Sequence, residues 1–318
     1  MEKGKKRLAT LVGCNYANTR NELYGCINDV LAMREVLISR FGFEPTNIQF
    51  LTDQPGSPVV PTGANILQAL NKMIDQAEDG DVLYFHYSGH GTRIPKPGHA
   101  SLKDEAIVPC DFNLITDVDF RKLVNRLPKG ASFTILSDSC HSGGLIDKEK
   151  EQIGPSAAKK PSNNDHKTRA IPYESVLQHL SSISGIESTD IGSHLCQAFG
   201  EEASSKFRLQ APHEHNLLGS AVHPDAGILL SGCQANETSA DMSASTETEG
   251  KAFGAFSYAV QLVLKAHSSA LSYRDIVTQA RKNLFEQGFE QHPCLYCSDE
   301  NANQPFLWQP EQPSKEKA

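Results

Sequence analysis

VLYFHYSGHGT at residues 82–92 is a short apolar run that passes into a polar, glycine-rich turn, and FTILSDSCHSGG at residues 133–144 has the same design. Apolar runs of this length are typical of buried strands. Glycines directly after a strand let the backbone turn sharply and come close to a ligand. Because open α/β sheets place their active sites at the carboxyl ends of their strands, these segments predict a site between two strand ends.

Strand and helix patterns alternate on both sides of these segments. Short apolar runs predict further strands at residues 8–12, 48–51 and 227–232. Apolar residues at helical spacing predict helices at residues 28–41, 66–77, 253–267 and 272–288, the last of them capped by Ser272. This alternation predicts an α/β fold with a mostly parallel central sheet and helices on both faces.

Composition divides the chain into three regions. Residues 1–147 carry the alternating pattern and form a large region. Residues 148–224 begin with a stretch almost without apolar residues, and we interpret them as a linker in which helical spacing returns at 173–200. Residues 225–318 resume the globular pattern as a small region.

Composition also excludes several classes of protein. With 318 residues, 39% of them hydrophobic, the chain can bury a sizeable core, and its net charge of −8 argues against a protein that wraps nucleic acid. No run approaches the eighteen apolar residues of a membrane span, and the N-terminal apolar stretch is too short for a signal peptide. Eight cysteines in so long a chain form no disulfide scaffold. We therefore expect no nucleic-acid or membrane partner and a cytoplasmic location, with nuclear location or unconventional release as alternatives.

His90 and Cys140 are the candidates for catalysis. His90 lies between two glycines beyond its strand, whereas His86 lies within the strand and is interpreted as a packed, hydrogen-bonded histidine. The glycine-rich context of this pair excludes the helix of a zinc site. Polar residues surround Cys140, unlike a structural thiol, and a thiolate beside a base is a nucleophile. The interval of about fifty residues from His90 to Cys140 is also the interval found in caspases.

These segments belong to a larger set that resembles the metacaspases, in particular the plant type II group. The set includes GCINDV at 25–30, DEAIVPCDF at 104–112, GILLSGCQANETSAD at 227–241 and HPCLYCSD at 292–299. The resemblance implies the caspase-hemoglobinase fold and a cysteine endopeptidase with Cys140 as nucleophile and His90 as base and acid. It further implies that the backbone N–H groups of Gly91 and Cys140 hold the oxyanion of the intermediate.

The resemblance also implies how the enzyme is made and used. It implies a zymogen that is activated by self-cleavage in the linker, a monomer, and protein or peptide substrates. A role in programmed cell death or in stress and defence proteolysis follows only from the family.

Charge predicts the specificity of such an enzyme. Asp138 lies two residues before the nucleophile, where the caspase signature has glutamine, and a carboxylate in the pocket attracts a cationic P1 side chain. The resemblance adds Asp29 as a second acidic wall, with Cys26 and Ser88 lining the pocket. Alternatively, Asp29 only opens the helix predicted at 28–41, where the helix dipole favours an acid. Together these residues predict cleavage after Arg or Lys.

The linker contains targets for that specificity. Its basic residues between 148 and 170 are Lys148, Lys150, Lys159, Lys160, Lys167 and Arg169. Arg169 lies where order should resume, and we predict self-cleavage after it, giving two fragments that stay associated.

The sequence predicts no required cofactor. Asp104, Asp117, Asp119 and Asp147 match positions that bind Ca²⁺ in calcium-dependent metacaspases, but Val118 interrupts the usual acidic triplet. The resemblance points to a calcium-independent subgroup, so these acids form at most a weak site, or are solvated surface carboxylates. The pair Cys294 and Cys297 is interpreted as packing, because a single C-x-x-C is a weak metal signal.

Three other functions stay open at this point. The chain could be a catalytically silent caspase-like scaffold, although it retains His90, Cys140 and both pocket acids. It could be a legumain-like peptidase, although a carboxylate gains little from a neutral Asn side chain. It could also be a metal-dependent hydrolase, which a chelator would inhibit and Cys140→Ala would leave active.

Overall fold

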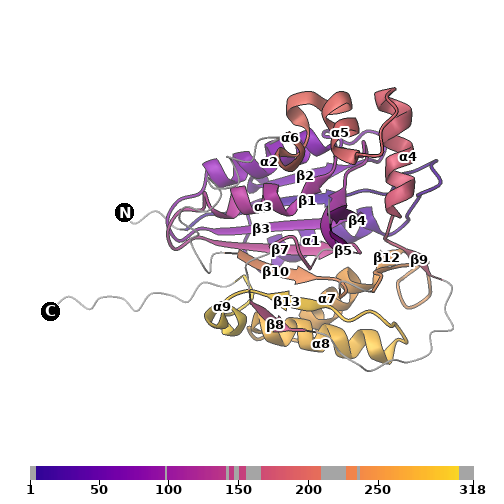
Figure 1. Ribbon diagram of the computed structural model, residues 1–318. Coiled ribbons are helices and arrows are strands. Elements are labelled where there is room, and N and C mark those ends of the chain that lie inside the picture. Colours follow the sequence, from indigo (N-terminus) through magenta and orange to yellow (C-terminus); the bar gives the residue numbers. More distant parts are fainter. Residues whose placement is uncertain are drawn as a thin grey trace.

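The computed structural model describes residues 5–96, 99–140, 143–146, 150–154, 166–208, 227–234 and 237–307. A seven-stranded sheet forms its centre, and Figure 1 shows the strands stacked from β2 to β8. Their order is β2 (Ile48–Thr52), β1 (Arg7–Gly13), β3 (Val82–Ser88), β7 (Ser132–Asp138), β10 (Gly227–Ser231), β13 (Cys294–Tyr296) and β8 (Glu151–Ile153).

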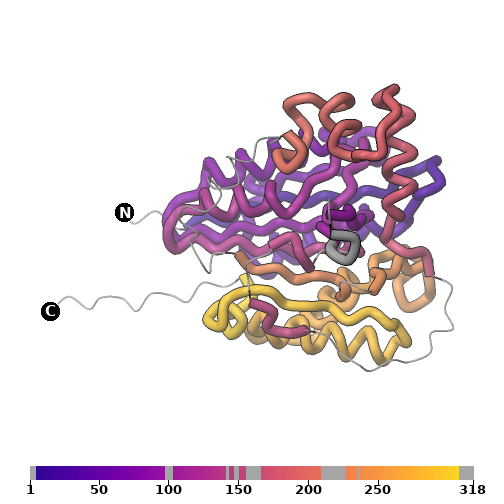
Figure 2. Tube along the Cα trace, in the orientation of Figure 1, coloured from indigo at the N-terminus to yellow at the C-terminus, as the bar shows by residue number. Residues whose placement is uncertain are grey.

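The strands from β2 to β10 are parallel, whereas β13 and β8 are antiparallel to their neighbours. The predicted mostly parallel α/β sheet is confirmed. The two chemistry-bearing segments enter it as β3 and β7, which are adjacent, with Ser88 opposite Asp138 at their carboxyl ends. Strand β8, magenta in Figure 2, lies among the yellow C-terminal elements because it pairs with β13.

Helices cover both faces of the sheet, because successive side chains of a strand point to opposite faces. Tyr84 of β3 packs in one apolar cluster with three helices, namely α1 (Cys26–Ser39), α7 (Ala255–Ala266) and α8 (Tyr273–Glu286). Its neighbour Phe85 packs in a second cluster on the opposite face with α2 (Gly63–Asp75) and α3 (Asp117–Val124). The short helix α9 (Asp299–Asn303) also packs against α8.

Two small sheets lie beyond the carboxyl ends of the central strands (Figure 1). One contains β4 (His90–Lys96), β5 (His99–Val108) and β6 (Ile115–Thr116). The other contains β12 (Phe253–Gly254), β11 (Ala240–Met242) and β9 (Lys167–Thr168). Strand β9 comes from the segment interpreted as a linker, so this segment is joined to the small region by backbone pairing.

The same segment also contains three helices, α4 (Tyr173–Ser184), α5 (Ile191–Phe199) and α6 (Ser205–Arg208). A third apolar cluster fixes them to the β4–β5 hairpin. It brings Val176, Leu180 and Leu195 of the helices against Ile94 and Val108 of the hairpin. The helical spacing at 173–200 therefore belongs to helices that pack against the rest of the protein.

Local sequence signals set most element ends within two residues of the expected positions. Ser272 caps α8 by accepting a hydrogen bond from the backbone N–H of Asp275, as expected. Helix α1 begins at Cys26, two residues before the expected start. The hairpin β4–β5 was not predicted, because its residues lack a clear alternation of apolar and polar side chains. Within the described ranges, no helix is both long and apolar enough to cross a membrane.

Ile135 and Ile183 allow a matched test of the core. The Ile135 side chain on β7 is fully buried, whereas Ile183 on α4 is 47% exposed. Ile135→Ala should reduce the free energy of unfolding by about 2–5 kcal/mol because it leaves a cavity. Ile183→Ala should change it by less than about 1 kcal/mol. Equilibrium urea denaturation measures both, and equal effects would contradict this packing.

Candidate active site

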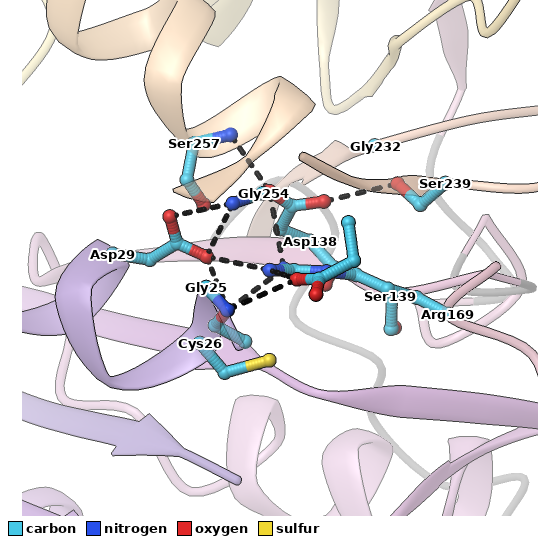
Figure 3. Close-up of polar contacts among 12 residues, drawn as sticks. Gly25, Cys26, Asp29, Asp138, Ser139, Arg169, Gly232, Ser239, Gly254 and Ser257 are labelled. Atoms are coloured by element: carbon cyan, nitrogen blue, oxygen red, sulfur yellow. Dashed lines mark hydrogen bonds and ion pairs between the residues drawn. The ribbon is translucent and has the colours of Figure 1, made fainter. Parts of the chain in front are cut away.

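A buried arginine lies between the carboxyl ends of β3 and β7. The Arg169 guanidinium is inaccessible to solvent and contacts three carboxylates. Its Nη2 lies 2.9 Å from Asp29 Oδ2 and 2.9 Å from Asp241 Oδ1, and its Nη1 lies 3.4 Å from Asp138 Oδ2. Nη1 also donates to Ser88 Oγ at 2.8 Å. Figure 3 shows the guanidinium enclosed by these groups, with Cys26 beside them.

Backbone donors hold the three carboxylates in place. Each accepts at least one N–H: Asp29 from Gly254 at 2.8 Å, Asp138 from Ser257 at 2.7 Å and Asp241 from Gly25 at 3.2 Å. A Cβ at position 254 would overlap the Asp138 carboxylate and the Arg169 guanidinium, so this approach requires glycine. The three carboxylates are therefore held by backbone donors as well as by the guanidinium.

Burial makes this pocket unfavourable for charge unless a cation fills it. The pKa of Asp29 is raised to about 7, chiefly by burial and also by the charge of Asp138, even though Arg169 lowers it. Clustered carboxylates without a counter-ion repel one another in a low dielectric. A guanidinium or ammonium group is thus the side chain that this pocket favours.

Two N–H groups converge on the carbonyl oxygen of Arg169. The N–H of Gly91 donates to it at 3.0 Å and the N–H of Cys140 at 3.3 Å. Paired donors on one carbonyl oxygen are the geometry of an oxyanion hole. A Cβ at position 91 would overlap the carbonyl oxygen of Cys140, so only glycine allows the two backbones this approach.

The Cys140 thiol lies at the same place. Its Sγ accepts the N–H of Ser239 at 2.9 Å and lies 3.6 Å from Thr168 Oγ1. Burial raises the pKa of the thiol, but hydrogen bonds with Cys233, Thr168 and Ser239 more than offset it, and the net effect lowers the pKa. A lowered pKa increases the thiolate fraction, which is the nucleophilic form.

His90 has one nitrogen fixed and one available. Its Nε2 lies 2.7 Å from the carbonyl oxygen of Asn21, which only accepts, so Nε2 carries the proton. Its Nδ1 is buried and has no hydrogen-bond partner among the residues that the structure describes. Burial lowers the pKa of His90 to about 4, against the opposing effect of the Asn21 backbone. A neutral imidazole with a free lone pair can act as a general base.

The strand β9 brings Arg169 to these groups. Thr168 pairs with Ala240 of β11, and the N–H of Arg169 donates to Ser239 O at 2.9 Å. On the other side of Arg169, the N–H of Ile171 donates to Gly91 O at 3.0 Å. Residues 167–171 therefore lie across the site as an added strand, held mostly by main-chain hydrogen bonds.

The chain is similar to known proteins over nearly its full length. The family model of the caspase domain matches residues 6–303. The chain is 59% identical to Metacaspase-9 of Arabidopsis thaliana, over 96% of this chain and 98% of the relative. It is 38% identical to Metacaspase-6 of the same plant, over 94% and 99%. The chain belongs to the plant metacaspases. It is a cysteine peptidase of the caspase family.

A solved structure shares the fold of this metacaspase. Protein GSU0716 from Geobacter sulfurreducens superimposes with a TM-score of 0.60 at 20% sequence identity, covering 94% of this chain and 97% of that one. At this identity the likeness concerns the fold alone.

Sequence reasoning missed Asp241 and Ser239 of the metacaspase site. Asp241 supplies the third carboxylate, and Ser239 contacts both the nucleophile and, through Oγ at 3.0 Å, Asp138 Oδ1. The two residues are two positions apart in extended backbone, a spacing that turns both side chains to one side. This spacing, within the segment 227–241 that resembles the metacaspases, was the sequence feature that could have indicated both residues.

Other predicted residues lie elsewhere. His86 is buried and lies 3.1 Å from Ser257 Oγ through Nε2, as expected for a packed histidine. Cys294 and Cys297 are buried free thiols, as the packing interpretation expects. Lys148, Lys159, Lys160 and Asp147 lie outside the described residues. Lys150 forms an exposed ion pair with Asp299.

The buried His86 predicts a measurable pH dependence of stability. Burial lowers its pKa to about 3, whereas an unfolded imidazole titrates near about 6.5. Between these values the unfolded chain binds a proton that the folded chain does not, so His86 reduces stability as pH falls below about 6.5. As the pH is lowered below 6, the free energy of unfolding should fall less steeply in His86→Gln than in the wild type. The two slopes should differ by roughly 1 kcal/mol per pH unit.

Urea denaturation between pH 5 and pH 7 measures the two slopes. Asp29 contributes with the opposite sign but is common to both proteins, so the comparison isolates His86. His267→Gln, at a partly exposed histidine, is the matched control and should keep the original slope. An unchanged slope in His86→Gln would show that His86 is protonated in the folded protein.

Proposed function

We propose that this metacaspase is an endopeptidase that cleaves after Arg or Lys and is made as a zymogen that cuts itself between Arg169 and Ala170. One observation carries the proposal. Arg169 fills the acidic pocket with its side chain while its own carbonyl oxygen accepts the N–H groups of Gly91 and Cys140. This is the arrangement of a P1 residue ready for attack.

The charge of the pocket supports the basic P1 preference. Three buried carboxylates, from Asp29, Asp138 and Asp241, face one site. An acidic P1 side chain would add a fourth negative charge without a counter-ion, at a high cost in a buried site. An Arg side chain suits the site best because its fork donates to several acceptors at once, while Lys offers a single point charge.

The proposed chemistry uses Cys140, His90 and the two backbone N–H groups that hold the carbonyl oxygen of Arg169. His90 takes the thiol proton of Cys140 on Nδ1, and the resulting thiolate attacks the carbonyl carbon of Arg169, whose oxyanion is stabilised by the two N–H groups. His90 then passes that proton to the amine of Ala170 as the C–N bond breaks, which leaves a thioester on Cys140. Water, deprotonated by His90, then hydrolyses the thioester, frees the thiol and gives Arg169 a carboxylate.

Self-cleavage should depend on both partners of this contact. Purified wild-type protein should convert to two fragments with a cut after residue 169, whereas Cys140→Ala and Arg169→Gln should stay uncut at that bond. Arg169→Lys should be cut more slowly, because an ammonium makes fewer of the contacts. Intact-mass spectrometry over time measures all four proteins.

The position of Arg169 within its own site also predicts the kinetic order. The first-order rate constant should be independent of protein concentration over a hundredfold dilution. Lys150→Gln, which removes another basic residue of the segment, is the control and should process like the wild type. Cleavage that persists in Cys140→Ala, or that is unaffected by Arg169→Gln, would contradict the proposal.

Asp241 should set the affinity for basic substrates. In the processed enzyme, Asp241→Asn should lower kcat/KM for an Arg peptide by roughly 10- to 100-fold, the usual worth of a charged hydrogen bond. Glu247→Gln, on an exposed loop, is the control and should have no effect. Fluorogenic Arg and Asp peptides provide the assay. Equal turnover of both peptides by the wild type would refute the specificity.

The proposal extends to the cellular setting. We propose action as a monomer in the cytoplasm, with a role in programmed cell death or in stress and defence proteolysis. Membership in the metacaspases is its only support.

A further inference from the structure

Lys206 lies between two carboxylates, one of them on the strand that pairs with β4. Its Nζ is 2.5 Å from Asp104 Oδ2 and 3.0 Å from Asp117 Oδ1. The second oxygen of each carboxylate contacts another cation: Lys96 Nζ lies 2.9 Å from Asp104 Oδ1, and Arg121 Nη2 lies 3.3 Å from Asp117 Oδ2. All four carboxylate oxygens are thus engaged by positive groups.

This cluster joins three segments that meet beside the active site. Asp104 is on β5, whose partner β4 carries His90 and Gly91. The next residue, Glu105, accepts the N–H of Gly144 at 2.5 Å, in the loop that follows the nucleophile. Lys206 comes from α6, beyond Arg169 in the chain, so its ion pairs tie the helical segment to the strand pair that carries the catalytic histidine.

Asp104 and Asp117 match positions that bind calcium in calcium-dependent metacaspases. The arrangement does not fit a metal ion here. Ca²⁺ requires six to eight oxygen ligands, and the oxygens of Asp104 and Asp117 already serve three cations. A divalent cation would have to displace these positive groups from the two carboxylates.

Asp119 is also committed elsewhere. Its carboxylate accepts the N–H of Thr116 at 2.9 Å and the N–H of Ser205 at 3.1 Å, which fixes the start of α3 to the α6 segment. No group of three or more His, Cys, Asp or Glu side chains suited to a metal occurs in the described part of the chain.

We propose that Lys206 is the built-in cation of this acidic cluster and takes the place that a divalent metal ion would need. The ammonium group neutralises Asp104 and Asp117 without an external ligand. The Lys206 side chain is only 20% exposed, so this pairing is shielded far more than that of Lys96, which is 43% exposed. Lys96 pairs with Asp104 and Arg121 pairs with Asp117, so both add to the neutralisation that Lys206 provides between the two carboxylates.

The state of Asp104 agrees with this role. Burial raises the pKa of its carboxyl, but the hydrogen bonds from Lys206 and Lys96 more than offset burial and lower it.

Calcium binding by the full-length Cys140→Ala protein tests the proposal, because this protein should stay intact. Without further change it should show no heat of Ca²⁺ binding up to millimolar concentration and no calcium-dependent shift in Tm. Lys206→Met keeps the aliphatic stem but removes the charge. It should lower Tm by about 2–4 °C and gain a weak, millimolar Ca²⁺ site that restores Tm.

Arg208→Ala is the matched control. Arg208 is on the same helix and pairs with the exposed Glu201 instead of the cluster. This variant should lose a positive charge without gaining a calcium response. Ca²⁺ binding by the Cys140→Ala protein that Asp104→Asn abolishes would overturn the proposal, and so would a Lys206→Met protein that does not respond to calcium.

Turnover of an Arg peptide gives a second readout. Wild-type activity should be indifferent to a chelator, whereas Lys206→Met should be activated by Ca²⁺ at least threefold. If Lys206→Met does not fold, Lys206→Gln provides the same comparison. The turnover measurement rests on the proposed specificity but the calorimetry does not, so failure of one is distinguishable from failure of the other.

Discussion

One buried guanidinium determines how the site of this metacaspase is assembled. Arg169 is the largest fully buried side chain among the residues that the structure describes, and its charge is tolerated only because Asp29, Asp138 and Asp241 surround it. These acids come from a helix, from the end of a central strand and from a small-sheet strand of the C-terminal region. A single cation thereby ties together parts of the chain that are more than two hundred residues apart.

The parallel sheet makes this convergence possible. Adjacent strands β3 and β7 end side by side, so the turns after them bring Gly91, the neighbour of His90 in the chain, next to Cys140. Glycine at 91 lets the two backbones approach closely enough for both N–H groups to reach one carbonyl oxygen. The same strand ends supply Ser88 and Asp138 to the pocket, so catalysis and specificity share one pair of strands.

Clustered carboxylates occur at a second place, but there the positive groups outnumber the carboxylates that they contact. In the pocket, three carboxylates face one cation, and this excess of negative charge agrees with the proposed cleavage after basic residues. In the acidic cluster, Lys206 and two further cations face Asp104 and Asp117, which leaves no deficit for a metal ion to fill. The helical segment that carries Lys206 is therefore part of the support of the catalytic strands.

The sequence by itself determined the alternating α/β fold, the two strands that precede His90 and Cys140, and the acidic character given by Asp29 and Asp138. Those features follow from local patterns: apolar runs, helical spacing and glycines after strands. Only the tertiary structure revealed Asp241, the seating of Arg169, the hairpin β4–β5 and the capture of Lys206. Each of these depends on which distant segments meet, and an isolated charge in the sequence does not indicate its partner across the fold.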